Sequence, residues 1–128
     1  IKILNLRFAS FNKDTNLINS NQNITGIDVR YVSPEQTGRM NRDTDHRTDI
    51  YSIGIIFYEL FSGSVPFSSK DRSEIIYKHI AQKHKRIRNI PNVLEKIIEK
   101  LLEKTPDKRY QSAQTLKVDL EKCLSNYK

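Results

Sequence analysis

The stretch Asp49–Phe67, DIYSIGIIFYELFSGSVPF, decides the fold that this sequence predicts. Its apolar residues surround almost the whole circumference of a helix: Ile50, Ile53, Ile55, Ile56, Phe57, Tyr58, Leu60 and Phe61. Gly63 and Pro66 then end the helix. A helix that is apolar on nearly all sides is buried by its neighbours, so we expect this one at the centre of a core. Asp49 stands at its start, where a carboxylate can cap the N-terminus and accept backbone N–H groups.

Two amphipathic helices are predicted after this stretch, because apolar residues recur there at helical spacing. The first is marked by Ile75, Ile76, His79 and Ile80. The second opens at Pro91 and Asn92 and stops before Pro106, since helices usually end ahead of a proline. Its one-sided stripe consists of Val93, Leu94, Ile97, Ile98, Leu101 and Leu102.

The two ends of the chain predict different structures. Towards the C-terminus, Ser112 is the expected N-cap of a last helix. The inner face of that helix consists of Ala113, Leu116, Leu120, Cys123, Leu124 and Tyr127. At the N-terminus, Ile1–Leu4 indicates a short strand, and the asparagine-rich residues Asn12–Thr25 indicate a loop over one side of the bundle. We therefore expect a mainly α-helical bundle with a short N-terminal strand.

Length and composition favour one intracellular domain. The 128 residues, 37% of them hydrophobic, suffice for one core and not for two. No apolar run approaches the roughly eighteen residues of a membrane-spanning helix, and no secretory signal opens the chain. Cys123 is the single cysteine, which excludes an internal disulfide and fits a reducing compartment. We expect a cytoplasmic domain over residues 1–128, forming one portion of a larger gene product because it starts without Met.

The charge is strongly positive and unevenly distributed. The chain has 22 Lys and Arg against 15 Asp and Glu, a net charge of +7, and much of the excess lies in residues 78–88. Such a cluster suits nucleic acid or an acidic partner. No aromatic residue interleaves its densest part, residues 83–88, so we favour a solvated basic loop over nucleic-acid binding.

Three blocks in fixed order point to a known family. Tyr31–Glu35 reads YVSPE, Asp49–Phe67 has the spacing Asp, Ser, Gly and a final Pro-Phe, and Leu101–Tyr110 reads LLEKTPDKRY. Together they resemble the C-terminal lobe of a eukaryotic-type serine/threonine protein kinase domain: the end of its activation segment, its central helix, and the segment that presents an arginine before its last helix. The resemblance implies a kinase-lobe helical bundle, with the magnesium motif and activation segment in residues 1–35 and a helical subdomain in residues 49–128.

The resemblance also implies roles for single residues. Ser33, Pro34 and Glu35 would anchor the activation segment, and Glu35 would form a buried ion pair with Arg109, 74 residues further on. Asp49 would brace the catalytic loop by hydrogen bonds, and Gly54 would let neighbouring backbone approach closely. The alternatives are an Asp49 that only caps a helix and a Glu35 and Arg109 that are unrelated surface charges.

Residues 33–42, SPEQTGRMNR, and His46–Asp49, HRTD, narrow the match. They resemble the kinase-like domains of large multi-sensor hybrid histidine kinases. The resemblance then implies partners within one parent chain: the kinase N-terminal lobe, a signalling ATPase, sensor modules and a histidine kinase. The protein substrate stays open.

The family uses ATP and magnesium, and several residues for that chemistry are absent or altered. The glycine-rich loop, the phosphate-binding lysine and the His-Arg-Asp catalytic loop would all precede Ile1, so no catalytic residue is assigned here. Asn5-Leu6-Arg7 occupies the place of Asp-Phe-Gly, and the neutral oxygen of Asn5 suits Mg²⁺ less well than a carboxylate. Ile27 and Asp28 replace the usual Gly-Thr. These departures favour a degenerate kinase, so we expect no ATP or metal binding by this chain alone.

The loop before Tyr31 offers two candidate phosphorylation sites, Ser20 and Thr25. The alternative is that both hydroxyls stay unmodified. Four arginines are near enough in sequence to clasp a phosphate on this loop, or else are simply solvated: Arg30, Arg39, Arg42 and Arg47.

Three functional hypotheses result. The first is that the chain forms part of a serine/threonine kinase domain and is inactive without the missing lobe. The second is a pseudokinase that acts as a scaffold or regulatory module. The third, favoured least, is a basic helical module that binds nucleic acid.

Overall fold

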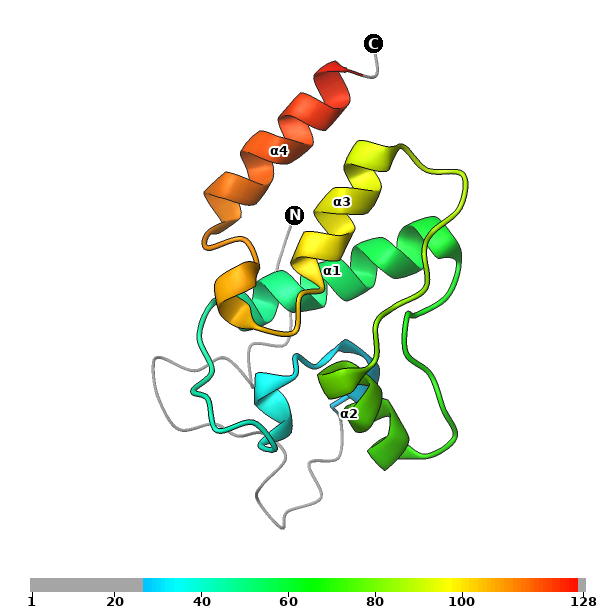
Figure 1. The fold of residues 1–128 in the computed structure, drawn as a ribbon, viewed down its shortest axis with the longest axis vertical. Helices are drawn as coiled ribbons and strands as arrows, with labels where there is room; N and C mark the ends of the chain where they lie inside the picture. Colours follow the sequence, from blue (N-terminus) through cyan, green and yellow to red (C-terminus); the bar gives the residue numbers. More distant parts are fainter. Residues whose placement is uncertain (1–26, 127–128) are drawn as a thin grey trace.

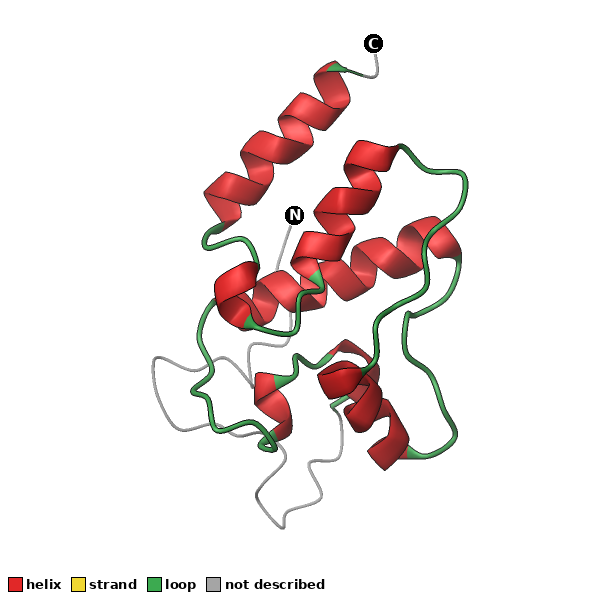
Figure 2. Ribbon diagram, viewed as in Figure 1, coloured by secondary structure: helices red, strands yellow, loops and turns green. Residues whose placement is uncertain are grey.

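The computed structural model describes residues 27–126, and these form a helical bundle. The elements in chain order are the 3-10 turns η2 (Val29–Tyr31) and η3 (Glu35–Thr37), the helices α1 (Arg47–Ser62), α2 (Arg72–Ala81) and α3 (Asn92–Leu101), the turn η4 (Pro106–Lys108), and helix α4 (Ala113–Ser125). In the view of Figure 1, α1 crosses the middle, with α3 and α4 on one side and α2 on the other. Figure 2 shows only helices and loops in the described part. The mainly α fold is confirmed, whereas the strand expected at Ile1–Leu4 and the loop expected at Asn12–Thr25 lie outside the described residues.

Helix α1 begins earlier than the sequence predicts. Its first residue is Arg47, whose backbone N–H donates to Asp45 Oδ1 at 2.8 Å. Asp49 is therefore the third residue of the helix, exposed in its first turn, and the prediction that it is the N-cap is wrong. A carboxylate there still interacts favourably with the positive end of the helix dipole. The helix ends as predicted at Gly63, which adopts φ 78° and donates to Glu59 O at 2.8 Å.

The burial of α1 is one-sided. Tyr51 and Ile55 are fully buried, and Ile50 and Tyr58 nearly so. Three residues that we expected inside are exposed, with Leu60 at 72%: Ile56, Leu60 and Phe61. The all-round apolar pattern is right, but the expectation that α1 is enclosed on every side is wrong within residues 27–126, because the elements described there pack on only part of it.

Helices α1 and α3 pack closely at Gly54. A Cβ atom at this position would lie 2.8 Å from Leu101 Cβ and 3.0 Å from Leu102 Cδ2. The closest atoms thus belong to Leu101, the last residue of α3, and to Leu102, which follows it, so Gly54 permits the close approach of these two segments. Around this contact lie two clusters of buried apolar side chains: Tyr51, Ile55, Tyr58, Phe67, Ile87, Ile98 and Leu102, and Ile50, Ile97, Leu101, Tyr110 and Leu116.

The amphipathic helices follow the predicted pattern with local exceptions. In α2, the Asp71 side chain caps the helix by accepting from Ser73 N at 2.8 Å. Its inner face is buried as predicted at Ile75, Ile76 and His79. In α3, Val93 at the N-terminal end of the stripe is exposed, so that part of the prediction is wrong.

Helix α4 starts as predicted and buries less than predicted. Ser112 Oγ accepts from Thr115 N at 3.2 Å, which makes it the N-cap. Leu116 is buried, and Leu120 and Cys123 pack against the second cluster. Ala113 and Leu124 are exposed, contrary to expectation, and Tyr127 lies outside the described residues. None of the helices in residues 27–126 combines the length and the apolar character that crossing a membrane requires.

Candidate functional site

The Ser33–Glu35 segment is folded into a tight, buried turn. Gln36 Oε1 accepts from Ser33 N at 2.9 Å, and Thr37 Oγ1 donates to Pro34 O at 2.6 Å. Gly38 then adopts φ 68°, the left-handed conformation that glycine takes without strain. The side chains of this turn are thereby withdrawn from solvent, and Glu35 is held in one orientation inside the bundle.

Glu35 and Arg109 form a two-pronged ion pair inside the bundle. Arg109 Nη1 donates to Glu35 Oε1 at 2.6 Å and Nη2 donates to Oε2 at 2.8 Å, with the two side chains 0% and 1% exposed. Thr48 Oγ1 adds a third donor to Oε1 at 3.1 Å. The expected contact is therefore present, and the alternative of two unrelated surface charges does not hold.

Arg109 also donates to three backbone carbonyl groups that the sequence did not reveal. Its Nε reaches Glu103 O at 2.7 Å, Nη1 reaches Arg47 O at 3.0 Å and Nη2 reaches Lys104 O at 3.1 Å. Its guanidinium carbon lies 4.8 Å from the centre of the Tyr51 ring. Arg109 thus joins the Ser33–Glu35 turn, the first turn of α1 and the loop after α3 through one planar group.

The charge state of Glu35 follows from these contacts. Burial is the largest influence on the pKa of Glu35 and acts to raise it. The hydrogen bonds and the positive charge of Arg109, with smaller help from Thr48, outweigh burial and hold that pKa below its ordinary value. Glu35 is therefore ionised at neutral pH, and the pair is a true carboxylate–guanidinium pair.

A second buried polar contact lies behind the pair. Tyr51 Oη and His79 Nδ1 are 2.9 Å apart, and the His79 ring packs edge-on against Phe67 with centroids 5.0 Å apart. Burial, followed by the charge of Lys104, lowers the pKa of His79 to about 4. His79 is therefore a neutral core residue and adds no charge to the basic cluster of residues 78–88.

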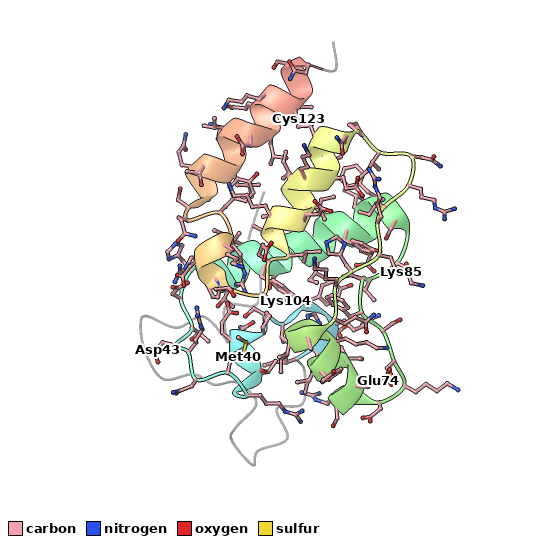
Figure 3. All side chains as sticks on the ribbon, viewed as in Figure 1. Met40, Asp43, Glu74, Lys85, Lys104 and Cys123 are labelled. Carbon is pink, nitrogen blue, oxygen red and sulfur yellow. The ribbon has the colours of Figure 1, made fainter. Side chains whose placement is uncertain are left out.

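Lys104 lies beside the Phe67 and His79 side chains, near the centre of Figure 3. Its Nζ donates to Lys78 O at 3.2 Å and sits 4.2 Å from the centre of the Phe67 ring. Burial, followed by the charge of Arg109, lowers the pKa of Lys104 to about 8. At neutral pH Lys104 is therefore mostly protonated, and its ammonium group contacts both the Lys78 carbonyl oxygen and the face of the Phe67 ring.

Helix α1 holds the upstream residue Tyr31 as well. Ser52 Oγ donates to Tyr31 O at 2.8 Å, and Tyr31 Oη donates to Glu59 Oε2 at 2.6 Å. The sequence predicts no structural role for Ser52, although a small hydroxyl among apolar residues of a helix is a signal for such a contact. Together with Thr48, which donates to Glu35, α1 thus holds the segment ending at Glu35 at three points besides the ion pair with Arg109.

The arginines proposed for a phosphate clasp mostly have carboxylate partners. Arg47 pairs with Asp45 at 2.7 Å and with Asp107 at 2.8 Å, and Arg42 pairs with Asp107 at 3.1 Å. Arg30 pairs with Asp28 through both carboxylate oxygens. Only Arg39 of the four has no ion pair among residues 27–126. The other three would have to exchange a carboxylate for a phosphate, and their contact with a phosphorylated loop stays a prediction.

The other predicted site residues are not brought to this place. Asn5-Leu6-Arg7, Ser20 and Thr25 lie outside the described residues. Asp49 is exposed at the surface of α1 and takes no part in the Glu35–Arg109 contact. Within the described part of the chain, no three His, Cys, Asp or Glu residues are grouped so that they could hold a metal ion.

Comparison with known proteins gives a match over nearly the whole chain. The family model of the protein kinase domain matches residues 1–120. The chain is 48% identical over 95 residues, 71% of its length, to hybrid signal transduction histidine kinase G of Dictyostelium discoideum. It is 45% identical over 98 residues, 73% of its length, to a probable serine/threonine-protein kinase of Clostridium perfringens, and 33% identical over 131 aligned residues, 99% of its length, to another of Clostridium acetobutylicum.

The matched region is a small part of each relative. It spans 3% of the Dictyostelium protein, 14% of the Clostridium perfringens protein and 19% of the Clostridium acetobutylicum protein. The match nevertheless includes all three blocks on which the helical fold and its buried ion pair depend. This chain belongs to the protein kinase domain family.

Proposed function

We propose that this chain supplies the C-terminal lobe of a serine/threonine protein kinase domain, whose family transfers phosphate from ATP, with magnesium, to protein hydroxyl groups. The observation that carries the proposal is the buried Glu35–Arg109 pair, which joins the end of the Ser33–Glu35 turn to the loop before α4. Kinase catalysis depends on positioning more than on covalent chemistry. A rigid attachment for the segment that presents substrate is what such positioning needs.

The attachment is redundant, which supports this role. Glu35 accepts from Arg109 and Thr48, while Tyr31 is held by Ser52 and Glu59 on α1. The segment therefore cannot shift as a unit without breaking contacts to α1 and to Arg109 together.

The chain by itself supplies little of the chemistry. Its four glycines are spread over Gly26, Gly38, Gly54 and Gly63 and form no glycine-rich loop. Its 128 residues contain no His-Arg-Asp sequence. The base and the phosphate-binding lysine must come from elsewhere in a parent protein, so we propose that this chain alone transfers no phosphate.

A pseudokinase role is the second candidate, and Asp28 favours it. Asp28 takes the place of the threonine that the family commonly has ahead of Tyr31. Its Oδ1 accepts from Arg30 N at 3.0 Å and from Arg30 Nε at 2.9 Å. The hydrogen bonds from Arg30 are the main cause that lowers the pKa of Asp28. A carboxylate already engaged by Arg30 there, together with Asn5 in place of the magnesium-binding aspartate, suits a scaffold better than an enzyme.

Transfer of labelled phosphate decides between the two roles. The full-length protein containing this sequence is incubated with radiolabelled ATP, Mg²⁺ and a general substrate such as casein. Magnesium-dependent labelling that disappears when the upstream catalytic aspartate is replaced would establish the kinase. If both the natural protein and its Asn5→Asp/Asp28→Thr variant label nothing, the pseudokinase is supported. Asp43→Asn, at an exposed carboxylate in the loop before α1, is the matched control.

The relatives suggest the setting. One is a hybrid signal transduction histidine kinase and two are probable serine/threonine-protein kinases. We propose that the parent of this chain is a signalling protein in which this lobe works beside further domains.

A further inference from the structure

The loop between α2 and α3 carries the strongest concentration of positive charge in the chain. Four of the six residues 83–88 are Lys or Arg: Lys83, Lys85, Arg86 and Arg88. All four are exposed, and Figure 3 labels Lys85 on this loop beside α1. Figure 2 shows the loop running without a helical turn from α2 to α3. The kinase function proposed above assigns this feature no role.

The loop is firmly attached to the bundle. Ile87 is buried in the cluster that contains Tyr51 and Tyr58, and Ile90 packs against the same cluster. The His84 ring meets the Tyr58 ring edge-on, with centroids 5.4 Å apart. Apolar contacts at every third residue therefore hold the loop down, while the residues between them remain exposed. Such a segment is a fixed surface and not a freely moving tether.

An ion pair adds to this attachment. Arg86 Nε lies 2.8 Å from both carboxylate oxygens of Glu95, a side chain of α3 that is otherwise buried. This pair neutralises Glu95 and leaves three positive charges without a carboxylate partner among residues 27–126: Lys83, Lys85 and Arg88. The loop therefore presents a net positive strip that is already in place before any partner arrives.

The backbone of the same strip is unpaired. Among residues 27–126, no backbone–backbone hydrogen bond involves residues 83–88. The one hydrogen bond to their backbone joins the His84 ring to the neighbouring Lys85 carbonyl group. Gln82, which leads into the strip, has the extended backbone angles φ −90° and ψ 132°. Free N–H and C=O groups on a fixed, non-helical segment are what an incoming extended peptide can pair with.

We propose that residues 83–88 form a docking edge for an extended, acidic segment of a partner protein. Backbone hydrogen bonds would give the contact its direction, and Lys83, Lys85 and Arg88 would select carboxylate side chains. Nucleic acid fits less well because the only ring in the strip, His84, is packed on Tyr58 and does not offer a free face for base stacking. The proposal concerns binding alone and does not depend on phosphate transfer.

Fluorescence anisotropy with a labelled peptide of alternating Glu and Val tests the proposal. The 128-residue chain should bind this peptide at low salt, and the affinity should fall as salt is added. The variant Lys83→Glu/Lys85→Glu/Arg88→Glu should bind at least about tenfold more weakly. The matched control Arg39→Glu/Lys108→Glu/Lys117→Glu changes the net charge equally at exposed sites elsewhere and should bind as the natural chain does. Equal losses in the two variants would overturn the proposal.

Two further probes sharpen the test. A peptide of the same sequence with N-methyl groups on alternate residues keeps its charge and loses backbone donors, so it should bind several-fold more weakly. Equal binding of the two peptides would show that backbone hydrogen bonds do not contribute, and would overturn that part of the proposal. A labelled single-stranded oligonucleotide should bind less well than the acidic peptide, and tighter binding would replace the proposal by a nucleic-acid surface. Far-ultraviolet circular dichroism of each variant, together with the milder Lys83→Gln/Lys85→Gln/Arg88→Gln variant, shows that any loss is not a loss of fold.

Discussion

Two groups of arginine–carboxylate contacts lie almost next to each other in this lobe and differ in their surroundings. Arg109 and Glu35 meet in the interior at 2.6 Å, nearly inaccessible to water. Two residues before Arg109, Asp107 is 65% exposed and pairs with Arg47 at 2.8 Å and with Arg42 at 3.1 Å. The nitrogen–oxygen distances in the two groups are similar. Water screens the outer contacts and cannot reach the inner one, so we expect the same chemical interaction to have very different consequences for stability.

The largest effect is expected on breaking the inner pair. Glu35→Ala leaves the guanidinium of Arg109 buried without a counter-charge and should lower the free energy of unfolding by about 3–5 kcal/mol. Urea denaturation measures this change. The double variant Glu35→Leu/Arg109→Met leaves no unpaired charge. It should therefore lower the free energy of unfolding by less than the sum of the losses in Glu35→Leu and Arg109→Met. Strictly additive losses would contradict a direct coupling between the two side chains.

The interior histidine sharpens the comparison through pH. The pKa of His79 is about 4 in the folded chain and 6.5 as its ordinary value, so between these limits the unfolded chain binds more protons. Stability is therefore fully present above pH 6.5 and is lost as the pH falls towards 4. The loss should be on the order of 3 kcal/mol, at 1.36 kcal/mol for each pKa unit. The lowered pKa of Glu35 acts in the same direction at still lower pH.

Thermal unfolding between pH 4 and 7 measures this dependence. His79→Asn should flatten the pH profile while lowering stability throughout, since it also removes the contact with Tyr51. Asn41→Gln, at an exposed uncharged side chain before α1, is the control and should leave the profile unchanged. If the stability of the natural chain does not vary over this range, the pKa of His79 is not lowered by folding, and the prediction is contradicted.

A smaller loss of stability is expected when a methyl group is added to the packed interior. In Gly54→Ala the new methyl group would lie 2.8 Å from Leu101 Cβ, so α1 and α3 must separate slightly. We expect a loss of about 1–3 kcal/mol, the usual range for overpacking. Gly63→Ala meets no atom within 4 Å but keeps φ at 78°, and should lower stability by about 1 kcal/mol. Chemical denaturation of both variants separates crowding from backbone strain.

The smallest effect is expected at the outer pairs. Asp107→Asn removes the carboxylate that Arg42 and Arg47 share, but Arg42 is exposed to solvent and Arg47 keeps its pair with Asp45. Exposed pairs contribute up to about 1 kcal/mol, and salt should reduce the difference further. Denaturation of the natural chain and the variant at low and high salt measures it. A loss as large as that of Glu35→Ala would mean that the two groups of contacts are not energetically distinct.

The helices were predictable because their signals are local. Apolar spacing predicted α2 and α3, Ser112 predicted the start of α4, and Gly63 predicted the end of α1. The first turn of α1 was placed too late, because the helix already starts at Arg47, whose backbone N–H donates to Asp45 Oδ1. Nothing in the spacing of apolar residues distinguishes that arrangement from an Asp49 cap.

Site residues were predictable only where a motif names them. The contact of Glu35 with Arg109 came from the resemblance to kinases and not from the spacing of the two residues. The carbonyl groups of Glu103 and Lys104 that also bind Arg109 carry no sequence signal, because every residue has a backbone carbonyl group. The pairing of Arg42 and Arg47 with Asp107 likewise has no sequence signal, because Asp107 lies about 60 residues further along the chain.

By itself the sequence determined that this chain is helical, where most helices begin and end, and which family it resembles. These properties depend on residues close together in the chain, whose periodicity and capping chemistry are set locally. Only the tertiary structure decided which face of α1 is buried, which charges are neutralised, and that His79 is a neutral core residue beside an outward-facing basic strip. Burial and charge pairing depend on groups brought together from distant positions, and water is excluded only after those groups have packed.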